Sequence, residues 1–335
     1  LAITTATLPE ATLNVAYAAS LAATGGTPPY TFGIAAGLPP GVVLNPATGD
    51  LSGTPTAAGV YAFTAQVTDA ALQVAQRNLE ITVPAPPSPI LAENALPGTP
   101  QAVWDVVGAG DPSIQGFATD ISVNKGGTIE FKIDTDADDY SIAIYRLGYY
   151  QGNGARLVTT LAPSATLPQI QPPCLNDTET GLIDCGNWSV SASWAVPGSA
   201  VSGIYLARLE RTDTAGASHV VFVVRDDART SDIVFQTADT TWQAYNEYGG
   251  NSLYVGSPNG RARKVSYNRP FTTRAVANGS DWLFNSEYPM VRWLEANGYD
   301  VQYITGVDSD RSPSLLLNRK LYMSNGHDEY WSWGM

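Results

Sequence analysis

The stretch Ile204–Val224 reads IYLARLERTDTAGASHVVFVV and predicts a β-hairpin in the middle of a chain of 335 residues. Ile204–Arg211 and His219–Val224 are apolar or alternating runs of strand length, and the polar residues of Asp213–Gly216 supply a turn between them. Similar runs and turns recur on both sides of the hairpin. Residues 101–227 are therefore predicted to form a β-rich module, a second β-sandwich in a multidomain chain.

Both cysteines of the chain, Cys174 and Cys185, lie in this module, in the segment CLNDTETGLIDC. The loop between them is polar, and their spacing does not suit CxxC zinc or redox chemistry. We therefore expect a disulfide, although two unrelated thiols are the alternative. A disulfide implies an oxidising compartment, so a secreted or cell-surface location is expected. The chain begins at Leu1 without a signal peptide, which suggests a processed start.

Four aspartates of the segment DTDADD follow one predicted strand of the module. They are Asp134, Asp136, Asp138 and Asp139. Aspartates at alternate positions can bind Ca²⁺. A solvated turn is the alternative, and it is favoured because the Gly and the distal Glu of an EF-hand loop are missing.

The pattern changes after residue 228, where short apolar strands alternate with helices. The predicted strands are Ile233–Phe235, Tyr299–Ile304 and Leu321–Ser324. Asn285 or Ser286 is expected to cap a helix that runs to about Asn297, and Pro313 starts a second, shorter helix. Residues 228–335 are therefore predicted to start an α/β domain with a parallel sheet of the flavodoxin or glutamine-amidotransferase type. Three strands do not complete such a sheet, so we expect a truncated domain.

The two histidines of the chain have different surroundings. His219 lies in the predicted hairpin beside Val220 and Val221, which favours a structural role. His327 lies in GHDEYWSW, directly after the third predicted strand, where open α/β sheets bind their ligands. The alternative is the start of a helix, where the positive end of the helix dipole would stabilise the acidic side chains of Asp328 and Glu329.

The composition narrows the possible partners. The formal charge of −13 disfavours nucleic acid and anionic membranes. No stretch approaches the roughly 20 apolar residues of a membrane span. The motifs GxSxG and HExxH, the Walker loop and paired CxxC are absent.

Residues 1–83 show short β-type runs separated by Gly and Pro turns, which predicts a β-sandwich. Residues 84–100, PAPPSPILAENALPGTP, contain six prolines and are predicted to form a semi-rigid linker. The text GLPPGVVLNPATGDLSGTPTAAGVYAFTAQVTD at Gly37–Asp69 resembles the Ig-like, cadherin-like repeat of bacterial surface and secreted proteins. That resemblance implies a spacer or adhesion role, with contact to a cell surface or polysaccharide. Calcium shared between repeats is not expected, because one repeat is visible.

Four segments resemble the large (beta) subunit family of N,N-dimethylformamidase from about Trp104 to the end. They are IYRLGYYQGNGARLV at Ile144–Val158, DIVFQTADTTWQAYNEYGGNSLY from Asp232, VSYNRPF at Val265–Phe271 and GHDEYWSW at Gly326–Trp333. The resemblance implies hydrolysis of an N-alkylformamide to formate and an amine. It also implies one iron ion held by two tyrosines and a glutamate.

Matching residue by residue, the resemblance assigns these ligands to Tyr245, Tyr267 and Glu329, with His327 as the polar partner in catalysis. Tyr248 is the alternative to Tyr245. Phenolate and carboxylate are hard donors that suit ferric iron. The residues expected to line the substrate pocket are Trp242, Asn246, Tyr248, Asn251 and Asn268. A further acid is expected downstream of Met335, so this chain alone is not expected to be fully active. A homo-oligomer or a small subunit is the expected assembly.

The leading hypothesis is therefore an exported, iron-dependent amidohydrolase for a small amide. One alternative is a non-catalytic surface or adhesion protein with a degenerate α/β domain. A carbohydrate-binding protein is the other, indicated by 17 Tyr and 8 Trp, which suit wet clefts. Iron distinguishes them, because only the enzyme needs it.

Overall fold

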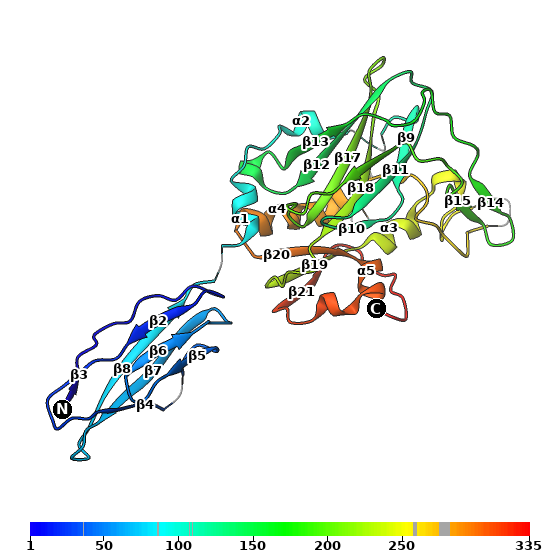
Figure 1. The fold of residues 1–335 in the computed structure, drawn as a ribbon. Helices are drawn as coiled ribbons and strands as arrows, with labels where there is room; N and C mark the ends of the chain where they lie inside the picture. Colours follow the sequence, from blue (N-terminus) through cyan, green and yellow to red (C-terminus); the bar gives the residue numbers. More distant parts are fainter. Residues whose placement is uncertain (36, 86, 107, 109, 257–259, 275–281) are drawn as a thin grey trace. The chain divides into compact units, whose positions relative to one another are not determined.

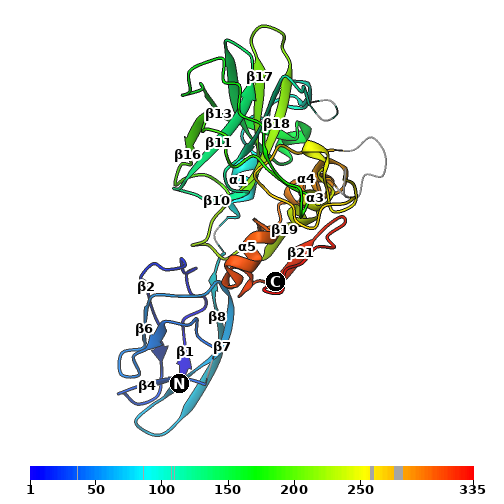
Figure 2. The same ribbon diagram turned by 90° about the vertical axis from the view of Figure 1, so that its right-hand side faces the viewer.

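The computed structural model describes residues 1–35, 37–85, 87–106, 108, 110–256, 260–274 and 282–335 (Figures 1 and 2). These residues form two compact units, Leu1–Pro87 and Ser88–Met335. In the described ranges, no helix is both long and apolar enough to pass through a membrane.

The first unit is a β-sandwich, as predicted. Its strands are β1 (Ala2–Ile3), β2 (Tyr17–Ser20), β3 (Ala23–Thr24), β4 (Thr31–Ile34), β5 (Val42–Leu44), β6 (Asp50–Gly53), β7 (Gly59–Thr68) and β8 (Val74–Val83). They pair as β2-β6-β5, β4-β7-β8 and β1-β3. Phe63, Ala65 and Val67 alternate into the core from β7, which is the period-2 burial of a strand with one wet face.

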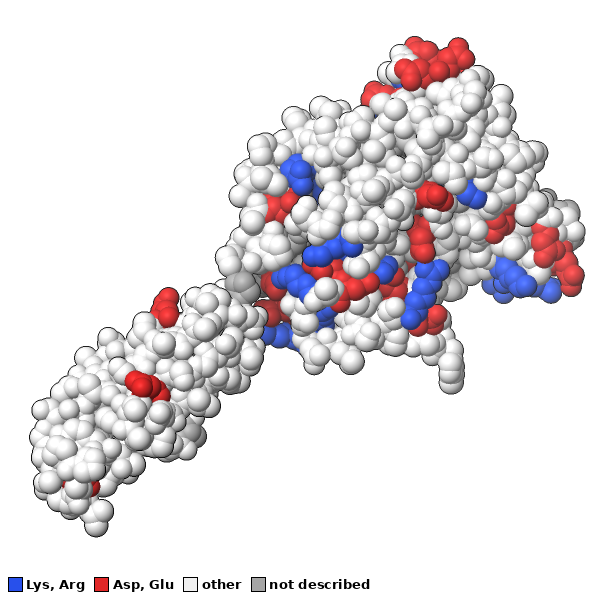
Figure 3. All heavy atoms as spheres, in the orientation of Figure 1, with Lys and Arg blue, Asp and Glu red and all other residues white. Residues whose placement is uncertain are grey.

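Charged side chains are scarce on the first unit, and Figure 3 shows an almost uncharged face there. Its sequence contains one basic residue, Arg77. Charge therefore contributes little to whatever this unit contacts.

The predicted linker over 84–100 is corrected by the structure. Helix α1 (Pro89–Asn94) lies inside it, with Ser88 as the capping residue and a proline at the first helical turn. Proline suits that position because its missing N–H would be unpaired anyway. Ile90 and Asn94 are buried, so this segment packs as part of the second unit.

The second unit begins with a two-sheet sandwich that follows α1 and α2 (Gln101–Trp104). The five-stranded sheet has the order β10-β18-β17-β12-β13, and the three-stranded sheet has the order β16-β11-β9. Their bounds are β9 (Ile114–Ala118), β10 (Ser122–Asn124), β11 (Thr128–Thr135), β12 (Tyr140–Leu147), β13 (Ala155–Leu161), β16 (Ala192–Ala195), β17 (Gly203–Arg211) and β18 (Ala217–Arg225). The predicted hairpin is β17 paired with β18. The expected disulfide joins Cys174 and Cys185, which flank the small hairpin of β14 (Leu175–Asp177) and β15 (Leu182–Asp184).

The five-stranded sheet is buried on both faces, because alternate residues of β18 belong to two different cores. Val220 and Phe222 pack in the core between the two sheets. Val221 and Val223 pack on the other side, against residues from 228 onward. The prediction of separate domains on either side of residue 228 is therefore corrected. The sandwich and the region after 228 share a core and form one unit.

The region after 228 carries a three-stranded parallel sheet, as the alternating pattern predicts. Its order is β20-β19-β21, with β19 (Ile233–Thr237), β20 (Val301–Thr305) and β21 (Leu321–Ser324). The helices between these strands are α3 (Asp239–Tyr245), α4 (Tyr288–Ala296), α5 (Gly306–Arg311) and the 3₁₀ turn Pro313–Leu316. The parallel strands were expected only here, but β10 also pairs in parallel with β18.

One helix boundary and one additional helix differ from the sequence-based expectation. Asn285 and Ser286 do not cap α4, because they lie inside a π-helical turn at Leu283–Glu287 that leads into it. Helix α5 was not predicted. Thr305 accepts a hydrogen bond from the Asp308 backbone while Asp308 accepts from the Thr305 backbone, which is a capping box.

A buried ion pair joins the sandwich to α4. Two nitrogens of Arg146 on β12 meet both carboxylate oxygens of Glu295, at 2.8 and 2.9 Å, and both side chains are 0% exposed. Asn94 of α1 and Tyr303 of β20 donate to the same carboxylate, at 2.7 and 2.9 Å. Every oxygen of Glu295 is thereby satisfied, which a buried charge requires.

His219 is structural, as its apolar neighbours predict. It is 8% exposed, and its Nε2 lies 2.9 Å from the carbonyl oxygen of Trp104, which fixes the Nε2–H tautomer. Burial lowers the pKa of His219 to about 4, with the nearby Arg274 acting in the same direction and the bond to Trp104 opposing it.

We expect Arg146→Met to lower the free energy of unfolding of the second unit by about 3–5 kcal/mol, because Glu295 would remain buried and charged. The measurement is urea unfolding followed by tryptophan fluorescence. All eight tryptophans lie in the second unit, so the signal reports on that unit alone.

Arg311→Gln is the matched control for this variant. Its ion pair with Asp120 has both side chains about half exposed, so its loss should cost less than about 1 kcal/mol. The double variant Arg146→Met/Glu295→Leu should recover part of the loss. An Arg146→Met cost no larger than that of the control would contradict the role of the pair.

We expect the second unit to lose stability as the pH falls from about 6.5 to about 4, because the unfolded state takes up a proton on His219 that the folded state refuses. His219→Gln removes this titration while keeping a donor toward Trp104. Between pH 7 and pH 4, the wild type should lose about 3 kcal/mol more than the variant in urea unfolding. Equal losses would show that His219 is protonated in the folded protein.

Candidate metal and catalytic site

The carboxyl ends of the three parallel strands lie at one edge of the sheet. β19 ends at Thr237 and is followed by α3, while β21 ends at Ser324 and is followed by residues 325–330. The backbone N–H of Glu329 donates to Thr241 Oγ1 at 3.1 Å, which ties the second segment to α3. The geometry therefore brings together two segments that are far apart in the sequence.

The structure unites three of the residues singled out from the sequence. The hydroxyl of Tyr245, at the end of α3, donates to Glu329 Oε1 at 3.0 Å. His327 Nε2 lies 3.1 Å from the other carboxylate oxygen, Oε2. The side chains of His327 and Glu329 are about one third exposed, so this cluster is reached by solvent.

Tyr254 belongs to the same cluster and was not singled out from the sequence. Its ring stacks on that of Tyr245 at 4.2 Å, and its hydroxyl donates to the same Oε1 of Glu329. The hydroxyl of Tyr330 lies 2.5 Å from the hydroxyl of Tyr254. The sequence signal was present, because the motif that begins at Asp232 ends on Tyr254. We name Tyr245, Tyr254, His327 and Glu329 the tyrosine–glutamate cluster.

The loop that carries Tyr254 is anchored by a buried arginine. Arg269 is 0% exposed and donates to the backbone carbonyls of Gln243, Tyr248 and Asn251, at 3.1, 3.2 and 2.7 Å. A guanidinium can serve three carbonyls because its donors form a fixed fork. Tyr254 therefore follows a backbone that is held from the end of α3 onward.

Hydrogen bonds from two phenols keep the carboxyl group of Glu329 ionised. The bond from Tyr254, and then the bond from Tyr245, holds the pKa of Glu329 below its ordinary value. Both phenols stabilise the carboxylate form, so Glu329 is an anion at neutral pH.

Tyr267 is hydrogen-bonded at the start of α3 and does not contact Glu329 through any bond that the structure shows. Its hydroxyl donates to Asp239 Oδ2 at 2.8 Å, and Asp239 also accepts from the backbone of Gly306 at 2.6 Å. Burial raises the pKa of Asp239 to about 6 and that of Tyr267 well above its usual value. This contact ties Tyr267 to the start of α3 rather than to Glu329.

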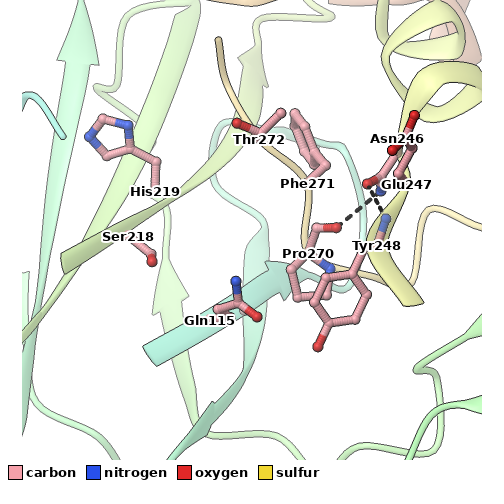
Figure 4. Close-up of a pocket in the computed structure, with 10 residues that line it drawn as sticks. Gln115, Ser218, His219, Asn246, Glu247, Tyr248, Pro270, Phe271 and Thr272 are labelled. Carbon is pink, nitrogen blue, oxygen red and sulfur yellow. Dashed lines mark hydrogen bonds between the residues drawn. The ribbon is translucent and has the colours of Figure 1, made fainter. Parts of the chain in front are cut away.

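Two of the five residues expected to line the substrate pocket do line a cavity. A pocket of about 220 Å³ lies between strands β9 and β18 and the loop after α3, and Asn246 and Tyr248 border it (Figure 4). The Asn246 side chain donates to the carbonyl of Pro270 at 3.0 Å, and its oxygen accepts from the Tyr248 backbone. Asn246 is therefore held by the protein while Tyr248 faces the space.

The other three expected lining residues are engaged in structural contacts. Trp242 is 1% exposed and donates to the buried carboxyl of Glu287 at 2.8 Å. Asn251 donates to the Gly181 carbonyl at 3.0 Å, and Asn268 faces Asp184. These residues hold the framework around α3.

Among the described residues, no set of three or more His, Cys, Asp and Glu side chains is placed to hold a metal ion. Tyrosine is not one of these four residue types, so this finding does not concern a metal site built on phenol oxygens. In the DTDADD segment, Asp134 accepts from the Gln171 backbone at 2.7 Å and Asp136 pairs with Arg211. These contacts test neither the solvated turn, which the sequence favours for this segment, nor its alternative, a calcium site.

Comparison with solved structures gives distant similarities. A putative alpha-galactosidase of Bacteroides fragilis is 23% identical over 28% of this chain and 19% of its own, with a TM-score of 0.21. An endo-fucoidan hydrolase of glycoside hydrolase family 107 is 18% identical over 65% of this chain and 27% of its own, with a TM-score of 0.21. An I-band fragment of titin is 11% identical over 68% of each chain, with a TM-score of 0.19. The chain thus spans about a fifth to a quarter of the two hydrolases.

No curated protein matches the chain. The model of the family described as "Putative Ig domain" matches residues 1–84, which confirms the resemblance found at Gly37–Asp69 and agrees with an extracellular protein. The model described as "N,N-dimethylformamidase beta subunit-like, C-terminal" matches residues 141–335. Because that match covers more than half of the residues, the chain belongs to the N,N-dimethylformamidase beta subunit-like family.

Proposed function

We propose that the second unit hydrolyses a small amide, such as an N-alkylformamide, with iron held by Tyr245, Tyr254 and Glu329. The observation that carries this proposal is that two stacked phenols direct their hydroxyls to one oxygen of Glu329. Two phenols on one carboxylate oxygen place three oxygen donors within hydrogen-bonding distance of one point. Membership of the dimethylformamidase-like family supports the same reaction class.

The donor set fits a ferric ion. Two phenolates and one carboxylate are hard oxygen ligands and together balance three positive charges. His327 holds Oε2 of Glu329, which leaves Oε1 toward the phenols. A ferric ion bound there would polarise the amide carbonyl and lower the pKa of a water.

The topology supports the location. We infer that β20-β19-β21 starts a flavodoxin-like or glutamine-amidotransferase-like sheet, because its strand order relative to the sequence is second, first, third. In sheets of that order, ligands bind where the connections diverge, between the first and third strands. Tyr245 follows the first strand, β19, and Glu329 follows the third, β21.

The residues of the chain have separate roles in the proposed reaction. His327 is reached by solvent and contacts the carboxylate, so it is the group placed to take a proton from water and return it to the leaving amine. Tyr330 holds the hydroxyl of Tyr254 and fixes the stack. Tyr267 positions α3 through Asp239, so it supports Tyr245 from behind the site.

The test is titration of the chain with ferric iron, followed by the visible absorption of an iron–tyrosinate complex. Tyr245→Phe and Tyr254→Phe should each weaken iron binding at least about tenfold, because each removes one ligand oxygen. Tyr267→Phe should keep the band, and Tyr322→Phe on β21 is the matched control.

Formate release from an N-alkylformamide is the second readout. His327→Asn should keep the absorption band and slow hydrolysis by about 100-fold or more, because it removes the proton carrier and not a ligand. Loss of the band in Tyr267→Phe but not in Tyr254→Phe would favour the set Tyr245, Tyr267 and Glu329. Absence of any band in the wild type would refute the iron site.

A further inference from the structure

A second cavity, of about 520 Å³, lies against α2 and α4 and shares no residue with the tyrosine–glutamate cluster. Its size falls in the roughly 300–1,000 Å³ of ligand pockets. The residues that border it are Gln101, Tyr149, Arg274, Phe284, Tyr288, Pro289, Arg292, Trp293 and Ala296. They supply aromatic rings, two guanidiniums, an amide and two phenols.

An exposed indole forms the rim of this cavity. Trp293 on α4 is 53% exposed, and its ring is stacked on that of Tyr299 at 5.4 Å with planes 28° apart. Tyr299 therefore supports one face of the indole from behind. A large ring held in water by another ring presents its remaining flat apolar face to a ligand.

A guanidinium without an anionic partner lies next to the indole. Arg292 lies over the ring of Tyr288 at 5.8 Å and donates to the Gly152 carbonyl at 3.0 Å. Among the described residues no carboxylate pairs with it, and its buried Nε has no hydrogen-bond partner. Arg274 differs, because Asp105 neutralises it at 2.7 Å. Among the residues that the structure describes, Arg292 is therefore a cation without a carboxylate partner at this cavity.

The chemistry of the lining specifies the ligand. A flat apolar face is needed for Trp293 and an anion for Arg292. The hydroxyl of Tyr149, and the capacity left on the Gln101 amide beside its bond to Asp105 at 3.0 Å, call for further hydrogen-bonding groups. A sugar ring with a carboxylate has all three features, since its C–H face stacks on aromatic rings and its hydroxyls face outward. A simple aromatic carboxylate would leave the polar rim without partners.

We propose that this cavity binds a uronic-acid residue of an acidic polysaccharide. The site is independent of the proposed amide hydrolysis. It places a sugar contact on α4 of the second unit, whereas the resemblance to the Ig-like repeat suggested such a contact for the first unit.

The test is calorimetric titration of the whole chain with trigalacturonate, with the neutral trisaccharide maltotriose and benzoate as the other two ligands. Trigalacturonate should bind at least about tenfold more tightly than maltotriose, and more weakly as salt is raised. Trp293→Ala and Arg292→Gln should each lower that affinity at least about tenfold. Arg292→Gln should also remove most of the preference over maltotriose.

Two matched variants control for general effects. Trp333→Ala removes a fully exposed indole of the same unit, and Arg311→Gln removes an exposed guanidinium; neither borders the cavity. Both should bind trigalacturonate like the wild type. The proposal is overturned if trigalacturonate does not bind, if it binds no better than maltotriose, if benzoate binds as tightly, or if Trp293→Ala binds unchanged. None of these results would bear on iron.

Discussion

The fold of the second unit depends on the ion pair between Arg146 and Glu295, because both charges are buried and need hydrogen-bond partners. Two opposite charges are removed from water completely, so each has to be satisfied by the other and by further polar groups. The partners come from α1, β12, α4 and β20, which are distant in sequence. Gly148 and Gly203 lie so close that a Cβ on either would meet Glu295 or Arg146 at 2.4 or 2.7 Å. The pair therefore constrains register, backbone and helix position together.

That constraint explains why the sandwich and the parallel sheet act as one unit. With Arg146 facing α4, the five-stranded sheet has no wet face, and its apolar residues divide between two cores. A sheet covered on both faces gives continuous rather than alternating apolar runs. The run HVVFVV at His219–Val224 has that character, and it accounts for the burial of His219 inside a strand.

The sequence alone predicted strands, turns, the disulfide and the parallel region, because these depend on local patterns of period 2 and 3.6 and on turn residues. The sequence-based predictions were wrong where a contact between residues distant in the sequence determines the local structure. Six prolines indicated a linker over 84–100, yet Pro89 begins α1 because Asn94 reaches Glu295. The boundary at 228 was placed at a real change of pattern, but a change of secondary structure does not show whether two cores are separate. Asn285 and Ser286 have capping side chains, and the π-helical turn before α4 places them out of capping position.

The site shows the same division between local and long-range information. Glu329 was found partly because its segment follows a strand of the parallel sheet, a position that can be read from the order of elements. Tyr245 was found through the resemblance of its motif alone. Tyr254 lies in a loop, so its place depends on Arg269 holding three carbonyls of that loop, which no periodicity reveals. Tyr267 has an equally good motif, but its hydroxyl is taken by Asp239, a buried carboxyl at the start of α3. A motif therefore identifies residues near the sheet edge, while the partner of each hydroxyl decides which of them meet at Glu329. The same reasoning separates Arg292 from Arg274, which both lie on aromatic rings in one cavity. Arg274 pairs with Asp105, whereas Arg292 has no carboxylate partner among the described residues and is left to attract an anion.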